Sequence, residues 1–275
     1  EVPLIDEVAA LMRDAARTVI LPLYQRLAVG QVEEKAPGDL VTVADRWAEE
    51  FLTAGLTKLL PGSTVVGEEA VAFDATLLDK LSGAGPVWLV DPVDGTANFA
   101  AGHGPFAVMV ALLEDGVTRT GWILDILLDR LAVATVGGGA YLDGVRLTVD
   151  QDAPPLSTLR GNMRSRFVPE AVRAALERRA YLVGEALPGT GCAAREYPDV
   201  LTGVQDFSFF WRTLPWDHAA GVLLAKECGA VARRLDGGAY QPGDLRPGLL
   251  VARNDSVWRQ VRDGLFTAEA GFPLA

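Results

Sequence analysis

The chain has 275 residues, of which 36 are Asp or Glu and 25 are Lys or Arg, so its formal net charge is −11. Nucleic-acid surfaces need clustered Lys and Arg, and this charge therefore argues against a nucleic-acid partner. The hydrophobic content of 49% is enough for a sizeable core, but no apolar run reaches the ~20 residues that a membrane span needs. The two cysteines exclude a disulfide framework. We expect a globular cytoplasmic protein that contacts no membrane.

The N-terminal region shows two helical patterns separated by a loop. Apolar residues recur at helical spacing over residues 4–27, where Pro22 would kink or end the helix. Residues 35–39 are predicted to form a loop. A second helix is predicted over residues 42–60 because a capping signal precedes it. A short strand is expected over residues 63–67.

Turn residues divide the rest of the chain into two halves. Strands with intervening Gly-containing turns over residues 106–148 indicate an antiparallel sheet. An Asp-Ala-Pro-Pro connector over residues 152–155 suggests two domains, an α+β half over residues 1–150 and an α/β half over residues 151–275. The elements predicted in the second half are a strand near Thr158, a helix over 169–179, a strand over 181–184, helices over 192–201 and 217–228, and closing strands.

The most informative segment covers residues 87–98. Its apolar beginning is typical of a buried strand, and this strand leads directly into two carboxylates, Asp91 and Asp94, held by a Pro-containing turn. Such carboxylates can direct oxygen atoms at a hard divalent cation. Gly95 and Thr96 follow with a backbone N–H and a hydroxyl that suit an anionic oxygen. The segment therefore predicts a metal-dependent phosphate site.

Three further acids lie at the boundaries of predicted elements. Asp45 and Asp217 are at helix starts, and Glu68 is at the end of a strand. Each has an ordinary explanation when taken alone, because acids cap helices and occupy solvated turns. Together with Asp91 and Asp94 they are much harder to explain as coincidence. Oxygen ligands with no Cys pair or His pair favour Mg²⁺ or Mn²⁺ over Zn²⁺.

Three signatures combine these acids in a fixed order: DLVTVAD at residues 39–45; GEE at 67–69, followed by DPVDGTANF at 91–99; and WDHAAG at 216–221, followed by ECG at 227–229. With these signatures the sequence resembles the inositol monophosphatase family of Mg²⁺-dependent, lithium-sensitive phosphatases, over most of its length. The resemblance implies an α+β fold, the layered α-β-α-β-α sandwich of the inositol monophosphatase and fructose-1,6-bisphosphatase type. It also implies a homodimer. Most metal ligands would come from the first half, and Asp217 and substrate contacts from the second.

The resemblance also implies a role for each residue of the site. Two or three Mg²⁺ ions would bind per active site, with Mn²⁺ able to replace them, and water would attack phosphorus directly with no phosphoenzyme. The catalytic residues would be Glu68 and the pair Asp45 and Thr96, which would orient and deprotonate the water. The metal ligands would be Glu68, Asp91, the backbone carbonyl of Val93, Asp94 and Asp217. The phosphate and the rest of the substrate would contact Asp94, Gly95, Thr96, Cys192, Ala193 and Asp217.

One segment departs from the family pattern where the substrate would bind. Phe210 takes the position at which inositol-hydrolysing members have an acidic residue that binds sugar hydroxyls. A Phe accepts no hydrogen bond from a polyol, which puts inositol phosphate in question as the substrate. The aromatic run over residues 207–211 is predicted to be a core or interface strand, and Arg212 beside it is a candidate contact for a second anionic group.

Four smaller features concern the surroundings of the site. Cys192 is predicted to be a small buried residue of the pocket, and no His has a spacing that identifies a partner for a nucleophilic thiolate. Ala97 replaces a Thr found in many members. We expect His103 to be a loop residue and His218 to lie on a helix surface or beside the site, without binding metal.

The leading hypothesis is a Mg²⁺-dependent phosphomonoesterase that acts on a small phosphorylated metabolite of the inositol monophosphate type. The alternative substrates are histidinol phosphate, a sugar phosphate and a 3′(2′),5′-bisphosphate nucleotide. A haloacid-dehalogenase-type phosphatase would need the motif Asp-x-Asp-Gly-Thr, whereas Pro92 and Val93 both separate the two acids here. A third interpretation is a regulatory binding protein on the same fold. Substitution of Asp94 by Ala would separate the phosphatase from the binding protein, because a binding role should survive the substitution.

Overall fold

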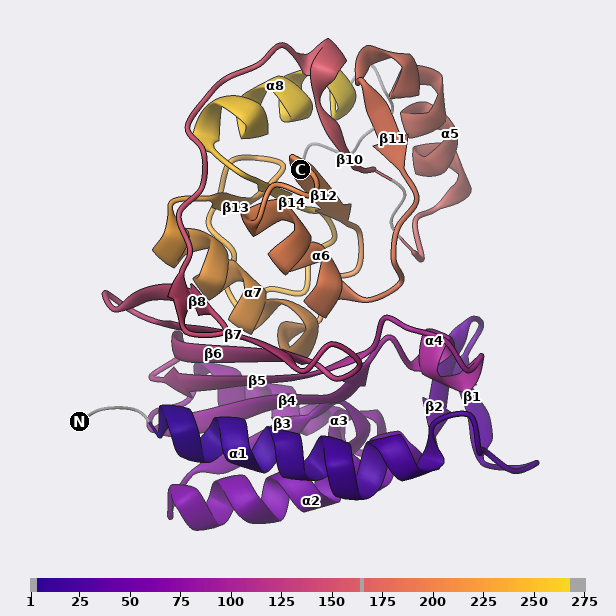
Figure 1. The fold of residues 1–275 in the computed structure, drawn as a ribbon, viewed down its shortest axis with the longest axis vertical. Helices are drawn as coiled ribbons and strands as arrows, with labels where there is room; N and C mark the ends of the chain where they lie inside the picture. The colour runs from indigo at the N-terminus through magenta and orange to yellow at the C-terminus, as the bar shows by residue number, and fades with distance from the viewer. Residues whose placement is uncertain (1–3, 164–165, 268–275) are drawn as a thin grey trace.

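The computed structural model describes residues 4–163 and 166–267, and these form five layers in the order helix, sheet, helix, sheet, helix (Figure 1). The predicted α+β class and the α-β-α-β-α sandwich are confirmed. None of the helices in the described residues is long and apolar enough to cross a membrane. The helices of the three helical layers are, from bottom to top of Figure 1, α1 (Ile5–Ala15) with α2 (Val43–Leu59), α6 (Ala193–Leu201) with α7 (Pro215–Cys228), and α5 (Glu170–Arg179) with α8 (Asp255–Leu265).

The lower sheet has seven strands that neighbour one another in chain order. The strands of the predicted meander after residue 106 pair antiparallel. The first two strands of the sheet, β3 and β4, instead run parallel, with Gly67 opposite Val90. This parallel pair places the carboxyl ends of two strands side by side. The strands are β3 (Thr64–Gly67), β4 (Pro86–Asp94), β5 (Ala107–Glu114), β6 (Val117–Asp125), β7 (Arg130–Thr135), β8 (Gly139–Leu142) and β9 (Val145–Arg146).

The upper sheet has five strands in the order β11-β10-β12-β14-β13. The aromatic run after residue 206 is its buried central strand, as predicted. The strand predicted over residues 181–184 is wrong, because exposed Tyr181 lies in a 3₁₀ turn and the strand begins only at Glu185. The strand predicted near Thr158 likewise begins later, after a 3₁₀ turn over Leu156–Thr158. The strands are β10 (Arg160–Asn162), β11 (Glu185–Leu187), β12 (Phe207–Phe210), β13 (Val231–Arg234) and β14 (Leu249–Ala252).

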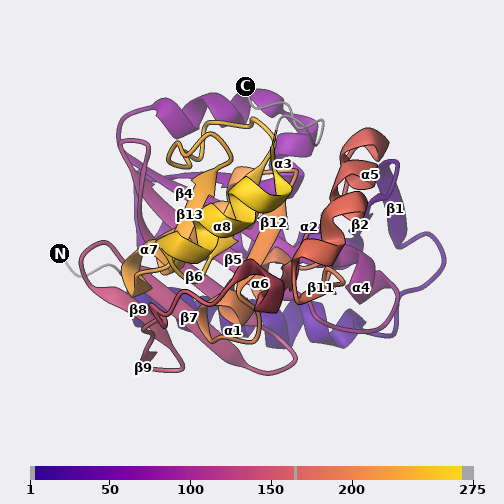
Figure 2. The ribbon, with the colours of Figure 1, turned by 90° about the horizontal axis from the view of Figure 1, so that it is seen from above.

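The segment predicted as a loop over residues 35–39 is the centre of a β-hairpin. The prediction is correct for the turn at residues 37–38 and wrong for the flanking strand residues. Strands β1 (Val32–Ala36) and β2 (Asp39–Thr42) pair antiparallel around Gly38, whose φ of 76° suits glycine. The charged residues of β1 have low strand propensity, which hid the strand. The hairpin lies at the same edge of the molecule as α5 (Figure 2).

The predicted closing strands are present as β13 and β14, but the described residues continue into helix α8, which the sequence analysis missed. Asn254 caps this helix by accepting a hydrogen bond from the backbone N–H of Val257 at 2.9 Å. Its buried side chains recur at helical spacing, so the pattern was present in the sequence. They are Val257, Trp258, Val261 and Leu265.

The remaining short elements connect these layers. Helix α1 continues through a π turn into a 3₁₀ turn that contains Pro22, so the first helical region ends where predicted. A long connection between β3 and β4 contains α3 and a 3₁₀ segment. These elements are the π turn over Ala16–Ile20, the 3₁₀ turn over Leu21–Leu23, α3 (Glu68–Phe73), the 3₁₀ segment over Ala75–Ser82 and α4 (Thr96–Ala100).

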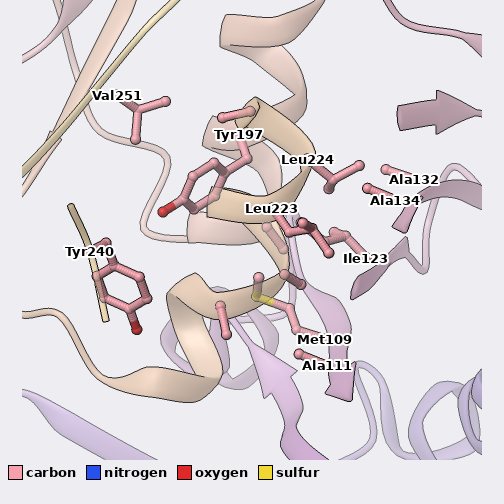
Figure 3. Packing of buried hydrophobic residues seen from close by; sticks show 14 of the residues in the cluster. Met109, Ala111, Ile123, Ala132, Ala134, Tyr197, Leu223, Leu224, Tyr240 and Val251 are labelled. Carbon is pink, nitrogen blue, oxygen red and sulfur yellow. The ribbon is translucent and has the colours of Figure 1, made fainter. Parts of the chain in front are cut away.

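Helix α7 is the centre of the sandwich, because it packs against strands of the lower sheet and against β13 of the upper one. Small residues pair across three strands of the sheet that α7 covers: Ala111 lies opposite Gly121, and Gly121 lies opposite Ala134. Figure 3 shows Ala111 and Ala134 in the packing around this helix. At Gly121 an added Cβ would be 2.6 Å from the Cα of Ala220, so the helix approaches the sheet at backbone distance. This close packing fixes the N-terminus of α7 relative to the end of β4.

Candidate active site

Three acids from separate segments converge above the end of the lower sheet. Glu68 follows β3 and Asp91 lies near the end of the parallel strand β4, while Asp217 is in the first turn of α7. Each of the three offers a carboxylate oxygen, and these oxygens all lie within 4.8 Å of one another. An all-oxygen donor set of this charge fits Mg²⁺ or Mn²⁺, the hard cations that such ligands favour.

Asp94, the second acid of the β4 motif, points toward the upper half of the molecule. Its Oδ2 accepts a hydrogen bond from the backbone N–H of Ala194 at 2.6 Å and from the Cys192 thiol at 3.2 Å. Burial raises the pKa of that thiol, so it stays protonated rather than becoming a nucleophile. Cys192 is therefore the small buried residue beside the pocket that its sequence predicted, and it orients Asp94.

Asp45 and Thr96 meet although 51 positions separate them in the chain. The Thr96 hydroxyl lies 2.9 Å from Oδ1 of Asp45 and 2.9 Å from the carbonyl oxygen of Val93. The other Asp45 oxygen accepts hydrogen bonds from the backbone N–H and the hydroxyl of Thr42 in a capping box at the start of α2. The Thr96 hydroxyl donates its one proton to one of these oxygens, and its lone pairs stay available to accept a hydrogen bond from a further group.

The turn after β4 depends on Gly95. Its φ is 89°, and an added Cβ would lie 2.7 Å from the carbonyl oxygen of Pro105. Any other residue would therefore be strained and would also clash with backbone. The turn leads into α4 with the backbone N–H groups of Gly95 and Thr96 beside the acids, the position that the sequence predicted for phosphate contacts.

Lys35 is a charged neighbour of the acids that sequence reasoning missed. Its ammonium group donates to Glu68 Oε1 at 2.7 Å and to Glu69 Oε1 at 2.9 Å, and these contacts raise the pKa of Lys35 although burial opposes the rise. Glu49 lies buried behind them and accepts the backbone N–H groups of Glu69 and Ala70 at the start of α3. Lys35 approaches only because the β1–β2 hairpin folds over the site, a feature with no local signal.

The acids of the site are held close together against their own repulsion. Burial raises the pKa of Asp91 and of Asp217 well above 3.8, and repulsion from Glu68 adds to both shifts. Burial also raises the pKa of Asp94 to about 6 and that of Asp45 to about 7. The folded chain therefore favours protons, or a bound cation, at this site.

In the absence of divalent cations, the free energy of unfolding should fall as the pH rises from about 4 to about 7. The carboxyls of Asp45, Asp94 and Glu49 have folded pKa values of about 7, 6 and 7, so the folded chain binds more protons than the unfolded chain in this range. His218 opposes the trend with a pKa lowered by burial from 6.5 to about 3, but it is a single group. Urea unfolding in EDTA at pH 5 and pH 7 measures the effect, and a higher midpoint at pH 7 would contradict it.

A cleft of about 390 Å³ opens above the acids. Of the predicted site residues, Asp45 alone is absent from its lining, which it reaches through Thr96. His103 lies in a loop as expected. His218 is not on a helix surface: it is buried, with Nδ1 2.9 Å from the Tyr197 hydroxyl and Nε2 3.1 Å from the carbonyl oxygen of Arg212. The helix is covered by both sheets, so it has no free surface at this position.

The departures from the family pattern line the same cleft. Phe210 lines it with a ring stacked on Tyr197, at 5.4 Å between centroids and 17° between planes. Arg212 also lines it, its Nη1 donates to Asp39 Oδ2 at 2.7 Å, and its charge lowers the pKa of Asp217 against the larger effect of burial. The cleft therefore combines acidic, aromatic and basic side chains.

The inositol monophosphatase family model matches residues 4–269. The chain belongs to the inositol monophosphatase family. It is 32% identical over 265 residues to an inositol-1-monophosphatase from Bacillus subtilis, covering 94% of each protein. It is 31% identical over 212 residues to a Thermotoga maritima fructose-1,6-bisphosphatase/inositol-1-monophosphatase, covering 76% of this chain and 77% of that protein. Among solved structures, the extragenic suppressor protein SuhB from Bartonella henselae superposes with a TM-score of 0.82 at 25% identity, covering 96% and 98% of the two chains.

Membership of the inositol monophosphatase family makes the chain similar to metal-dependent phosphatases that act on small phosphorylated compounds. The oxygen cluster agrees with such a metal dependence, because burial and mutual repulsion raise the pKa of Asp91 and of Asp217 even with Lys35 beside Glu68 and Arg212 acting on Asp217. The family and the donor set together support a phosphatase whose acids hold divalent cations.

Proposed function

We propose that this chain is a Mg²⁺-dependent phosphomonoesterase that hydrolyses a small phosphorylated metabolite by direct attack of water. The observation that carries the proposal is the convergence of Glu68, Asp91 and Asp217, with ligand oxygens within 4.8 Å, beside the Asp45–Thr96 pair. Two or three ions would be held by these acids together with Asp94 and the carbonyl of Val93. When bound, the ions would neutralise phosphate charge and lower the pKa of water.

The chain's own residues would position and deprotonate the attacking water. The Thr96 hydroxyl would accept a hydrogen bond from the water and donate its own proton toward Asp45, whose carboxylate sits 2.9 Å away. A buried carboxyl with a raised pKa accepts a proton more readily than an ordinary one. The N–H groups of Gly95 and Thr96 would hold phosphate oxygens, and Glu68 would help to place the water.

The organic part of the substrate would lie against Cys192, Ala193 and Phe210, which line the cleft together with the acids. Phe210 offers no hydrogen-bond acceptor, so a neutral polyol such as inositol would lose a contact. Histidinol phosphate, a sugar phosphate and a 3′(2′),5′-bisphosphate nucleotide are therefore tested beside inositol 1-phosphate. The cytoplasmic location stays a prediction from the composition, and the homodimer stays a prediction from the resemblance.

Phosphate release from this panel, measured with Mg²⁺ and with EDTA, tests the proposal. We expect turnover that depends on Mg²⁺, is restored by Mn²⁺, and is lost in Asp94→Asn. The preferred ester names the substrate class. If Mg²⁺ binds but no ester is hydrolysed, the phosphatase proposal is wrong, and a binding function that survives Asp94→Ala becomes the better reading.

A further inference from the structure

The cleft has an unusual charge distribution for an acidic protein. The acids of the proposed metal site line it, yet Arg166, Arg173 and Arg212 line it as well. The whole chain has only 25 basic residues against 36 acidic ones. Several guanidinium groups around one cleft of about 390 Å³ are therefore a local concentration of positive charge.

Arg212 is held in place by contacts on two sides. Its Nη1 donates to Asp39 on β2 at 2.7 Å, and its guanidinium lies 4.0 Å from the centre of the Phe167 ring. Arg166 lies over the same ring at 5.0 Å and donates to the carbonyl oxygen of Gly38 in the hairpin turn. The hairpin and the segment at residues 166–167 therefore bring two guanidinium groups to one ring at the edge of the cleft.

Such a fixed guanidinium is suited to a planar anionic group. A guanidinium has five N–H donors, and the Asp39 contact uses Nη1 alone of the three Arg212 nitrogens. Guanidinium groups bind phosphate and carboxylate with paired, charge-assisted hydrogen bonds. Immobilisation by ring and ion pair lowers the ordering cost of binding an anion there.

Phe210 gives the cleft one apolar wall. Phe210 is buried against Tyr197 and His218, with ring centres 5.4 and 4.8 Å away. This wall offers no acceptor for substrate hydroxyls, so affinity for the part beyond the scissile phosphate has to come from elsewhere. Arg212 follows Phe210 by two positions on the same segment and supplies that contact.

From this arrangement we propose that the physiological substrate carries a second anionic group, bound by Arg212 with Arg166 where the two guanidinium groups flank the Phe167 ring in the lining of the cleft. The inference rests on the proposed phosphatase function and narrows its substrate class. The shared chemistry is a second phosphate or a carboxylate on a phosphomonoester. A neutral polyol monophosphate is a poor substrate by the same argument.

Matched substrate pairs test the proposal. Each pair differs only in the second anion: fructose 1,6-bisphosphate with fructose 1-phosphate, adenosine 3′,5′-bisphosphate with adenosine 3′-phosphate, and 2-phosphoglycerate with glycerol 2-phosphate. In wild type we expect kcat/KM to be at least about 10-fold higher for the doubly anionic member of one pair. The first two pairs identify a phosphate and the third identifies a carboxylate. Ratios near one in all pairs, with Mg²⁺-dependent turnover intact, overturn the inference and leave the phosphatase proposal standing.

Three variants show whether Arg212 provides the preference. Arg212→Met should reduce the ratio about 10-fold or more, whereas Arg259→Met on the outer helix α8, where the side chain is 67% exposed, should leave it unchanged. Asp39→Asn removes the ion pair and keeps the guanidinium, so the preference should persist. If Asp39→Asn abolishes the preference as Arg212→Met does, Arg212 serves only to hold the hairpin, and the inference is wrong.

Binding provides a readout that is independent of turnover. Calorimetric titration of the same pairs in EDTA compares wild type with Arg212→Met without hydrolysis. Tighter binding of the doubly anionic member by wild type alone supports the anion site, even if no ester is hydrolysed and the phosphatase proposal fails. If wild type and Arg212→Met each bind the two members of every pair with equal affinity, the proposed anion site is wrong.

Discussion

Replacement of Asp91 by Asn should reduce kcat for Mg²⁺-dependent phosphate release by about a thousandfold or more. Asp91 lies between Glu68 and Asp217 in the oxygen cluster and is 2% exposed. Loss of its charge removes several kcal/mol of cation binding and transition-state stabilisation, and each 1.4 kcal/mol corresponds to a factor of about ten. Steady-state phosphate release at saturating Mg²⁺ measures the loss.

The same substitution should have the opposite effect on the metal-free fold. Burial raises the pKa of Asp91, and repulsion from Glu68, Asp94 and Asp217 raises it further, so its charged form destabilises the folded chain at neutral pH. Asp91→Asn should therefore unfold at higher urea than wild type in EDTA, and Mg²⁺ should stabilise it less. Glu50→Gln, at an exposed position of α2, is the control. Reduced stability of Asp91→Asn in EDTA would show that the acids are not in mutual repulsion.

Gly121→Ala should lower the free energy of unfolding by about 3 kcal/mol and reduce activity as well. The new Cβ would lie 2.6 Å from the Cα and 2.9 Å from the Cβ of Ala220, so helix α7 has to move as a body. Asp217 in the first turn of α7 would move with it, away from Asp91 on β4. Urea unfolding and Mg²⁺ titration of the same preparation measure both consequences.

The matched control for this prediction is Gly243→Ala. Nothing lies within 4 Å of a Cβ at Gly243, and its φ is not in the left-handed region. Its stability and activity should equal those of wild type. If Gly121→Ala is as stable as the control, the contact between α7 and the sheet is more adaptable than the structure indicates.

Prediction from sequence succeeded where the relevant interactions are local. The segment from Asp91 to Thr96 is contiguous, so its position at the end of a strand could be recognised from the apolar run before it. The predicted turn over Asp91 and Asp94 is wrong in detail, because both acids belong to β4 on either side of a register shift and the turn comes at Gly95. The layered fold followed from the resemblance and is confirmed. The convergence of Glu68 and Asp217 on Asp91 is seen in the structure, while their roles as metal ligands stay predictions.

Prediction failed where burial is decided by segments far apart in the chain. Of the two positions predicted for His218, the helix surface is wrong, because α7 is covered by both sheets and the residue is 1% exposed, whereas a position beside the site is correct, because His218 lines the cleft. Lys35 contacts Glu68 across 33 positions, and only the hairpin geometry brings them together. Helix α8 is a different case, because the capping residue Asn254 and the helical spacing of the apolar residues after it could have predicted this helix from sequence.

The position of α7 between the sheets has a consequence for dividing the chain. The helix comes from the C-terminal half by sequence, yet it covers β4 to β8, strands of the N-terminal half. A fragment ending near residue 150 would leave that sheet face bare, and the complementary fragment would carry an uncovered helix. We therefore expect neither half to fold without the other. An exchange of C-terminal halves between relatives would have to keep the small residues at Gly121 and its neighbours, on which α7 packs.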